Sequence, residues 1–304
     1  MPTHAPGRFR TLAPLAALCT LAAACSPFEF EAQELVLRHD SEGDSLELGI
    51  VYEGLSCGDQ GNDPLAVSVE AMQRIVAGDR YFMLLAWPFL FDFDRPRVES
   101  DPEELPTEWE VRAQDLMRSL EVTEAVLFED EQGRLGAVQR LRLENASKSI
   151  ATLNAWLNVV VIESLKENAE EDGDLDGRTR DLMLAHARSG KPWILLVRGG
   201  FEVRVPLSRA LAARQLAALA TPPDEHSLQD RGVAADLLAS LSEISFADEL
   251  LVLRFLPDEE GRVVFRFHLP DSPYDERLRR ALQDGDVGVP AHTLAWARER
   301  ARGQ

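Results

Sequence analysis

The sequence predicts an α+β fold in which antiparallel hairpins alternate with helices. One observation is that pairs of short segments, with roughly every second residue apolar, flank turns rich in glycine and acidic residues, which is typical of hairpins. A second is that segments with a helical spacing of apolar residues lie between these pairs. Hairpins build antiparallel sheet that helices can cover on one face, so the alternation indicates α+β and not a doubly wound parallel sheet.

The first hairpin and the helix behind it show the pattern clearly. The hairpin is expected over 34–39 and 45–53, because apolar and more polar residues alternate along its second segment. Asp63 is expected to cap a helix that runs to about residue 77. Pro64 suits the first turn of that helix, where the missing N–H is not needed.

Hairpins recur three more times along the chain. They are expected at 120–128 with 134–143, at 193–197 with 201–205, and at 250–256 with 262–269. The remaining helices are expected at about 147–171, 178–188, 209–219, 232–244, 274–283 and 291–301. A repeated ββα unit is one interpretation, with a sub-boundary near the proline- and acid-rich segment 94–107. A single continuous sheet is the alternative.

Two pairs of residues have a specific expected role within this framework. Gly199 and Gly200 separate two strands and are expected to supply the positive φ of a tight hairpin turn. Asn154 and Asn158 lie four apart on the long helix and therefore share a face. We expect them to hydrogen-bond inside the fold, for example to a strand edge, with a ligand as the alternative.

The amino-terminal segment carries a recognisable motif. Arg8 and Arg10 precede an apolar stretch over 12–24 that ends in Leu-Ala-Ala-Ala directly before Cys25. A basic segment, an apolar core and small residues before a cleavage site make a secretory signal. The stretch has 13 residues, whereas a membrane-spanning helix needs about 20. With a cysteine at the cleavage site, the first 26 residues resemble the signal peptide and lipobox of bacterial lipoprotein precursors.

The resemblance implies a lipid anchor. Cleavage between Ala24 and Cys25 would remove residues 1–24, and Cys25 would carry diacylglycerol on its sulfur and a further acyl chain, such as palmitate, on its new amino end. Three acyl chains hold a protein at a membrane far more firmly than one. Residues 25–33 would then be an acylated tether, and 34–304 an extracytoplasmic domain.

The net charge of the chain limits the classes of molecule that it can bind. It contains 32 basic and 52 acidic residues, and removal of residues 1–24 takes away two arginines, which leaves a net charge of −22. Nucleic acid is excluded, because its binding needs a basic surface. Cationic protein partners in the cell envelope remain open. Ser26 stands where an aspartate would imply retention in the inner membrane, so we expect the outer membrane of a diderm bacterium.

Two short patterns suggest catalysis. Ser56 lies in Gly-Leu-Ser-Cys-Gly, which matches the nucleophile motif of serine hydrolases, although residues 59–63 separate this motif from the helix that should follow at once. Asp92 and Asp94 flank Phe93 and would project to one side of a strand as an acid pair. Cys57 has no partner in the chain if Cys25 is acylated, and we expect a buried thiol.

One pattern suggests a metal. Asp172, Asp174 and Asp176 alternate before Gly177, which resembles the first half of an EF-hand loop. The bidentate acid of that loop would fall on Met183, so the calcium site would be incomplete. The alternative is a linker in which Asp174 or Asp176 caps the next helix.

The expected function is therefore that of a lipid-anchored envelope domain that binds or scaffolds without catalysis and needs no cofactor. An envelope hydrolase that uses Ser56 or the acid pair is one alternative. A calcium-stabilised adhesion module is the other.

Overall fold

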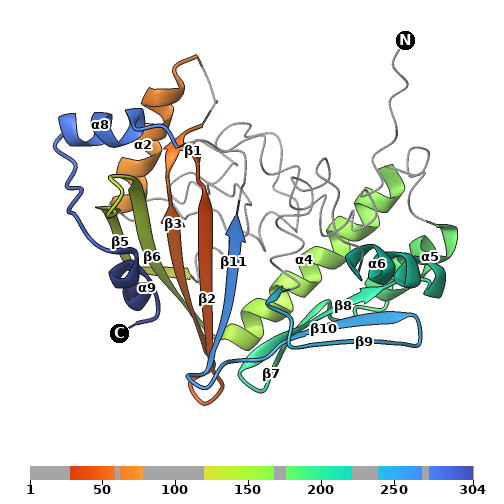
Figure 1. The fold of residues 1–304 in the computed structure, drawn as a ribbon. Coiled ribbons are helices and arrows are strands. Elements are labelled where there is room, and N and C mark those ends of the chain that lie inside the picture. Colours follow the sequence, from red (N-terminus) through yellow and green to blue (C-terminus); the bar gives the residue numbers. More distant parts are fainter. Residues whose placement is uncertain are drawn as a thin grey trace, which may run out of the picture.

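The protein has an α+β fold with antiparallel sheets, as the sequence predicts (Figure 1). This computed structural model describes residues 28–58, 62–77, 120–167, 176–220, 239–268 and 274–303. Several sequence predictions lie outside these ranges, namely those on Ala24, Cys25, segment 94–107, Asp92, Asp94, Asp172 and Asp174.

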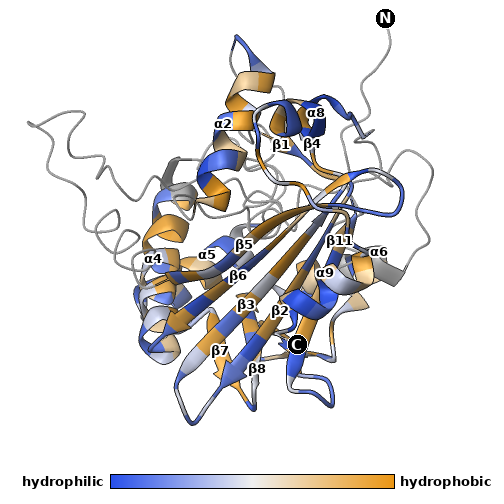
Figure 2. Ribbon diagram, turned by 90° about the vertical axis from the view of Figure 1, so that its left-hand side faces the viewer, coloured by the Kyte–Doolittle hydropathy of each residue, from blue (hydrophilic) through white to orange (hydrophobic). Residues whose placement is uncertain are grey.

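The larger sheet has five strands, all paired antiparallel, in the order β11-β2-β3-β6-β5. Its strands are β2 (Ala32–Asp40), β3 (Ser45–Glu53), β5 (Leu120–Glu129), β6 (Leu135–Glu144) and β11 (Arg262–His268). Apolar and polar residues alternate along these strands, which Figure 2 shows as orange and blue bands. The hairpins β2–β3 and β5–β6 correspond to the first two of the four predicted hairpins. In each, a short turn brings neighbouring segments together.

The smaller sheet has four strands in the order β7-β8-β10-β9. Its strands are β7 (Ile194–Val197), β8 (Gly200–Pro206), β9 (Glu243–Ala247) and β10 (Leu250–Phe255). The β7–β8 turn lies one residue earlier than predicted. Its positive φ angles are 46° at Arg198 and 81° at Gly199, while Gly200 opens β8. Positive φ at both central residues suits a two-residue hairpin.

Helices connect and cover the sheets. They are α2 (Pro64–Val76), α4 (Ala146–Glu167), α5 (Gly177–Arg188), α6 (Arg209–Ala220), α8 (Arg277–Asp284) and α9 (Leu294–Ala301). The cap on α2 is confirmed, since Asp63 accepts from Ala66 N at 3.2 Å. None of the helices in the described ranges combines the length and apolar character needed to cross a bilayer.

The recurring unit is longer than the predicted ββα. Each sheet contains two hairpins joined through a helix, and the order β2-β3-β6-β5 matches the order β7-β8-β10-β9. A Glu-Arg-Glu triplet crosses the last three strands of each set, with Glu47, Arg142 and Glu121 in one and Glu202, Arg254 and Glu243 in the other. The repeat is therefore ββαββ in the described residues, and the two copies form separate sheets.

The predicted hairpin 250–256 with 262–269 is wrong. β10 pairs with β8 and β9, whereas β11 joins β2 in the other sheet. The predicted helix to about residue 244 is also too long, because β9 begins at Glu243. The true hairpin is β9–β10, whose turn residues Asp248 and Glu249 both have positive φ, at 52° and 59°. Segments that are neighbours in the sequence are expected to pair as a hairpin. Here the pairing of β10 and β11 depends instead on contacts with strands that are distant in the sequence.

The turn before β11 explains this error. Asp258 accepts from Arg262 N at 2.9 Å, and Asp258 N donates to Arg262 O at 2.7 Å. Asp130 and Arg134 make the same two contacts in the β5–β6 turn, both at 2.9 Å. The local chemistry of a hairpin turn is therefore present before β11, but the strands on either side diverge into two sheets.

The tether predicted over 25–33 is too long. Strand β1 (Phe28–Glu29) pairs antiparallel with β4 (Ser56–Cys57), and Phe28 and Phe30 are buried at 0% and 1% exposure. Both phenylalanine rings contact Tyr52 edge-on. Burial of these two aromatic side chains stabilises the packing of residues 28–30 against the rest of the domain.

One apolar core joins the two sheets. Phe201 and Phe255 of the smaller sheet both contact Phe265 of the larger one, with ring centroids 5.6 and 5.1 Å from that of Phe265. The opposite face of the larger sheet is covered by α9. A Cβ added at Gly49 would lie 1.9 Å from Ala301 O, so α9 sits directly on this glycine.

Candidate functional site

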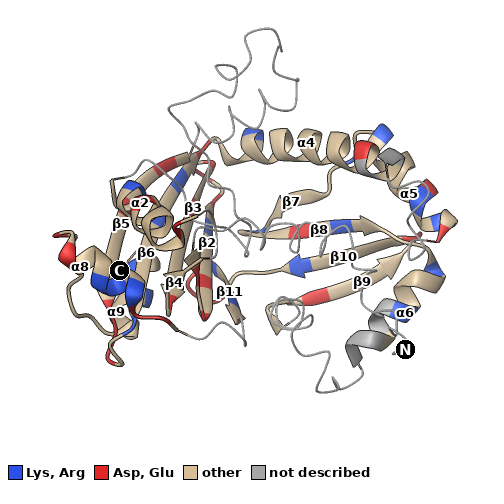
Figure 3. Cartoon of the chain, turned by 90° about the horizontal axis from the view of Figure 1, so that it is seen from above, with Lys and Arg blue, Asp and Glu red and all other residues tan. Residues whose placement is uncertain are grey.

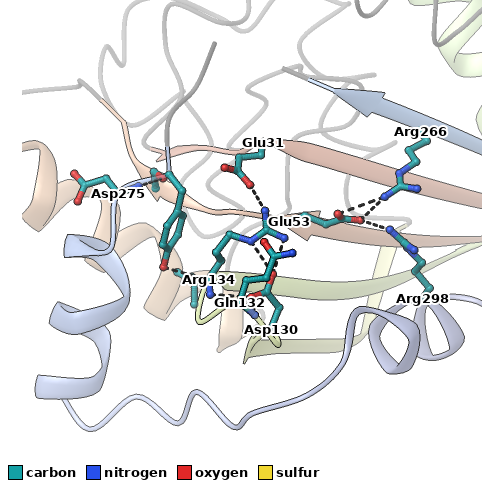
Figure 4. A network of polar contacts seen from close by, with 11 residues as sticks. Glu31, Glu53, Asp130, Gln132, Arg134, Arg266, Asp275 and Arg298 are labelled. Carbon is teal, nitrogen blue, oxygen red and sulfur yellow. Dashed lines mark hydrogen bonds and ion pairs between the residues drawn. The ribbon is translucent and has the colours of Figure 1, made fainter. Parts of the chain in front are cut away.

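The most distinctive polar site is a network of carboxylates and guanidinium groups at one end of the larger sheet (Figure 4). We call it the end network. It consists of Glu31, Glu53, Asp130, Arg134, Arg266 and Arg298. Its members come from five places in the chain, namely the β1–β2 connection, β3, the β5–β6 turn, β11 and α9.

Arg134 connects the first strands to the β5–β6 turn. Its Nε donates to Asp130 Oδ2 at 2.8 Å, and its Nη1 donates to Glu31 Oε2 at 2.5 Å. Burial acts to lower the pKa of Arg134, but the hydrogen bond and charge of Asp130, with Glu31 and Glu53 nearby, outweigh it and raise the pKa. Arg134 is thus a permanent cation that holds two carboxylates.

Glu53 connects the sheet to α9. Its carboxylate accepts from Arg298 Nη2 at 2.6 Å and from Arg266 Nη2 at 3.1 Å. Glu34, on the same face, accepts from Arg302 Nη2 at 3.2 Å. Both glutamates are less than a tenth exposed, so loss of a guanidinium would leave a buried charge unpaired. The end network therefore fixes α9 to the sheet, and in Figure 3 the basic residues of α9 lie beside it.

The smaller sheet carries a second arrangement of this kind. Glu202 is 3% exposed and accepts from Arg204 Nε at 2.6 Å and from Arg254 Nε at 2.8 Å. Burial acts to raise the pKa of Glu202, but its hydrogen bonds to the two arginines outweigh burial and lower it. In both sheets the buried carboxylates are used to cross-link strands.

Ser56 does not have the surroundings of a nucleophile elbow. It lies in the short strand β4, is 2% exposed, and its Oγ accepts from Asp275 N at 2.9 Å. A nucleophile elbow needs a helix directly after the serine, whereas α2 begins only at Pro64. The neighbouring Cys57 is a free, buried thiol as expected, and burial raises its pKa.

Asp176 acts as a helix cap. Its Oδ1 accepts from Thr179 N at 2.7 Å, and its Oδ2 accepts from Ser208 Oγ at 2.6 Å. Burial acts to raise the pKa of Asp176, but the bonds from Ser208 and Thr179 outweigh it and lower the pKa. Within the described ranges, no three His, Cys, Asp or Glu residues gather closely enough to hold a metal ion. The capping alternative is thus confirmed for Asp176.

Both asparagines of α4 hydrogen-bond inside the fold, as predicted, Asn154 to a strand edge and Asn158 to a side chain. Asn154 Oδ1 accepts from Trp193 N and Ile194 N, both at 2.8 Å, and its Nδ2 donates to Ile194 O at 2.7 Å. Asn158 Oδ1 accepts from Trp193 Nε1 at 2.7 Å. The Asn154 amide both accepts from and donates to this backbone, as a peptide group of a neighbouring strand would do. It therefore satisfies the open edge of β7 where no further strand pairs with it in the described residues.

Sequence reasoning missed the end network. The predicted tether includes Glu31, and no sequence pattern links Glu53 with Arg298, which is 245 residues away. One signal was present, because Asp130 and Arg134 have the same spacing as Asp258 and Arg262 around a turn glycine.

Comparison with known proteins adds no relative to this description. No family model, no curated protein and no solved structure matches the chain.

Proposed function

We propose that this protein is a lipid-anchored extracytoplasmic domain of a diderm bacterial envelope that binds or scaffolds partners. The observation that carries the proposal is the lipobox-like motif ending at Cys25. The start of the fold supports it, since the first described strand begins at Phe28, only three residues later. Cleavage after Ala24 would leave every described element intact.

A binding or scaffold role suits the polar chemistry of the described residues. The buried carboxylates of the end network and of Glu202 accept hydrogen bonds from arginines, so they connect elements of the fold. The mature chain would carry a net charge of −22, which favours cationic envelope proteins as partners. Such association should weaken as salt rises.

The anchor is tested by intact-mass analysis of the protein expressed in a diderm bacterium. We expect loss of residues 1–24 and a mass increase of one diacylglycerol and one acyl group. Cys25→Ala should abolish this modification and leave the protein unprocessed. Cys19→Ala is the matched control, because it also removes a cysteine of the signal segment and should change nothing in the mature product. A mature chain with an unmodified Cys25 sulfur would refute the proposal.

A further inference from the structure

The proposed lipid anchor determines which end of the domain meets the bilayer. Cys25 lies three residues before Phe28, and three residues of any chain span at most about 11 Å. Phe28 is itself immobilised, because it is fully buried and pairs with Cys57. The headgroup layer of a bilayer is about 5–7 Å thick on each side. The β1 end of the domain is therefore held within roughly two headgroup layers of the lipid.

Helix α8 lies at this same end. Glu29 of β1 pairs with Ser56 of β4, and Ser56 Oγ accepts from Asp275 N, just before α8. Figure 2 places β1, β4 and α8 together at one end of the larger sheet, and Figure 1 shows β1 and α8 at that end. The β2–β3 turn lies at the other end of β2, a strand of nine residues that spans about 30 Å.

Helix α8 carries exposed arginines at this end of the domain. The helix contains three arginines and one aspartate, and Asp275 and Glu276 just before it form ion pairs with Arg277 and Arg280. The side chains of Arg277 and Arg280 are 68% and 65% exposed. Guanidinium groups bind phosphate oxygens well, and ion pairs between exposed side chains are weak enough to exchange a carboxylate for a phosphate. The arginines of α8 therefore suit a surface of zwitterionic phospholipid headgroups.

We propose that the face formed by β1, β4 and α8 rests on the phospholipid headgroups of the membrane. This inference depends on the lipid anchor of the proposed function and adds an orientation to it. Arg277 and Arg280 face the headgroup phosphates, and the β2–β3 turn and its sheet end point away from the membrane toward partners.

The test measures the distance of two sites from the headgroups. Single cysteines are introduced as Arg277→Cys on α8 and, as the matched control, Ser41→Cys in the exposed β2–β3 turn. Each purified acylated protein is labelled with a fluorophore and reconstituted into phosphatidylcholine vesicles with or without nitroxide-labelled headgroups. The parent protein, in which the remaining thiol Cys57 is buried, reports background labelling.

A nitroxide quenches a fluorophore only at short range, and the headgroup layer is about 5–7 Å thick. A label at position 277 that lies in or beside this layer should lose about half of its fluorescence. The label at position 41 should keep its fluorescence. Equal quenching at both positions, stronger quenching at 41, or none at 277 would overturn the orientation while the anchor stands. A bare Cys25 sulfur would overturn both proposals, and its mass reveals it before any quenching is measured.

Discussion

Replacement of Asn154 by alanine should remove more stability than its size suggests. The Asn154 amide makes three hydrogen bonds of 2.7–2.8 Å to the backbone of Trp193 and Ile194, and the residue is 8% exposed. A hydrogen bond contributes about 1 kcal/mol, so three bonds correspond to about 3 kcal/mol. At about 2–4 °C per kcal/mol for a domain of this size, the Tm should fall by about 6–12 °C.

The assay is urea unfolding followed by circular dichroism, with two matched variants of the same helix. Asn158→Ala removes the single bond to Trp193 Nε1 and should cost about 1 kcal/mol. The Thr152 hydroxyl bonds only to Lys148 O of its own helix, so Thr152→Ala should stay within about 0.5 kcal/mol of the parent. If Asn154→Ala costs no more than Asn158→Ala, the amide does not replace a strand, and the reasoning fails.

Three further predictions concern packing, pH and thiol reactivity. Gly49→Ala should lower the free energy of unfolding in urea by about 3 kcal/mol, because the added Cβ would lie 1.9 Å from Ala301 O. Gly177→Ala is the control and should be near neutral, because its Cβ would meet nothing within 4 Å. Burial lowers the pKa of His186, so the unfolded chain binds a proton more readily than the folded one, and stability should decline as pH falls through about 6.5, the pKa of an unfolded histidine. His186→Gln should flatten that decline in thermal melts, and an unchanged pH profile would contradict the assignment. The Cys57 thiol is 9% exposed with a raised pKa, so a disulfide reagent should react with it rapidly in urea but slowly in the native protein, and equal rates would show that it is accessible.

The elements that could be predicted from sequence are those made by local chemistry. The hairpins β2–β3, β5–β6 and β7–β8 each join neighbouring segments through a short turn, and the caps at Asp63 and Asp176 bond amides three residues away. Alternation and turn residues are sufficient for such contacts, because every partner lies within a few residues.

The candidate site was less predictable, because its contacts are distant in sequence. Glu53 accepts from Arg266 and Arg298, which are 213 and 245 residues away. Each of these side chains alone has the appearance of an ordinary surface charge. Glu53 becomes a buried, ion-paired carboxylate only because β11 and α9 both return to the same end of the sheet.

By itself, the sequence determined the α+β class, most hairpins and helices, the acidic charge and the motif at Cys25, since each depends on spacing or composition along the chain. Only the tertiary structure decided that β10 and β11 belong to different sheets, that the described hairpins of the two sheets share one strand order, and that Phe28 and Glu31 belong to the fold. The physical reason is that a turn such as Asp258–Arg262 specifies a reversal of the chain but not the strand that follows it. After that turn, Phe255 of β10 and Phe265 of β11 pack against each other in a core shared by both sheets, and burial of this apolar surface stabilises the two-sheet arrangement.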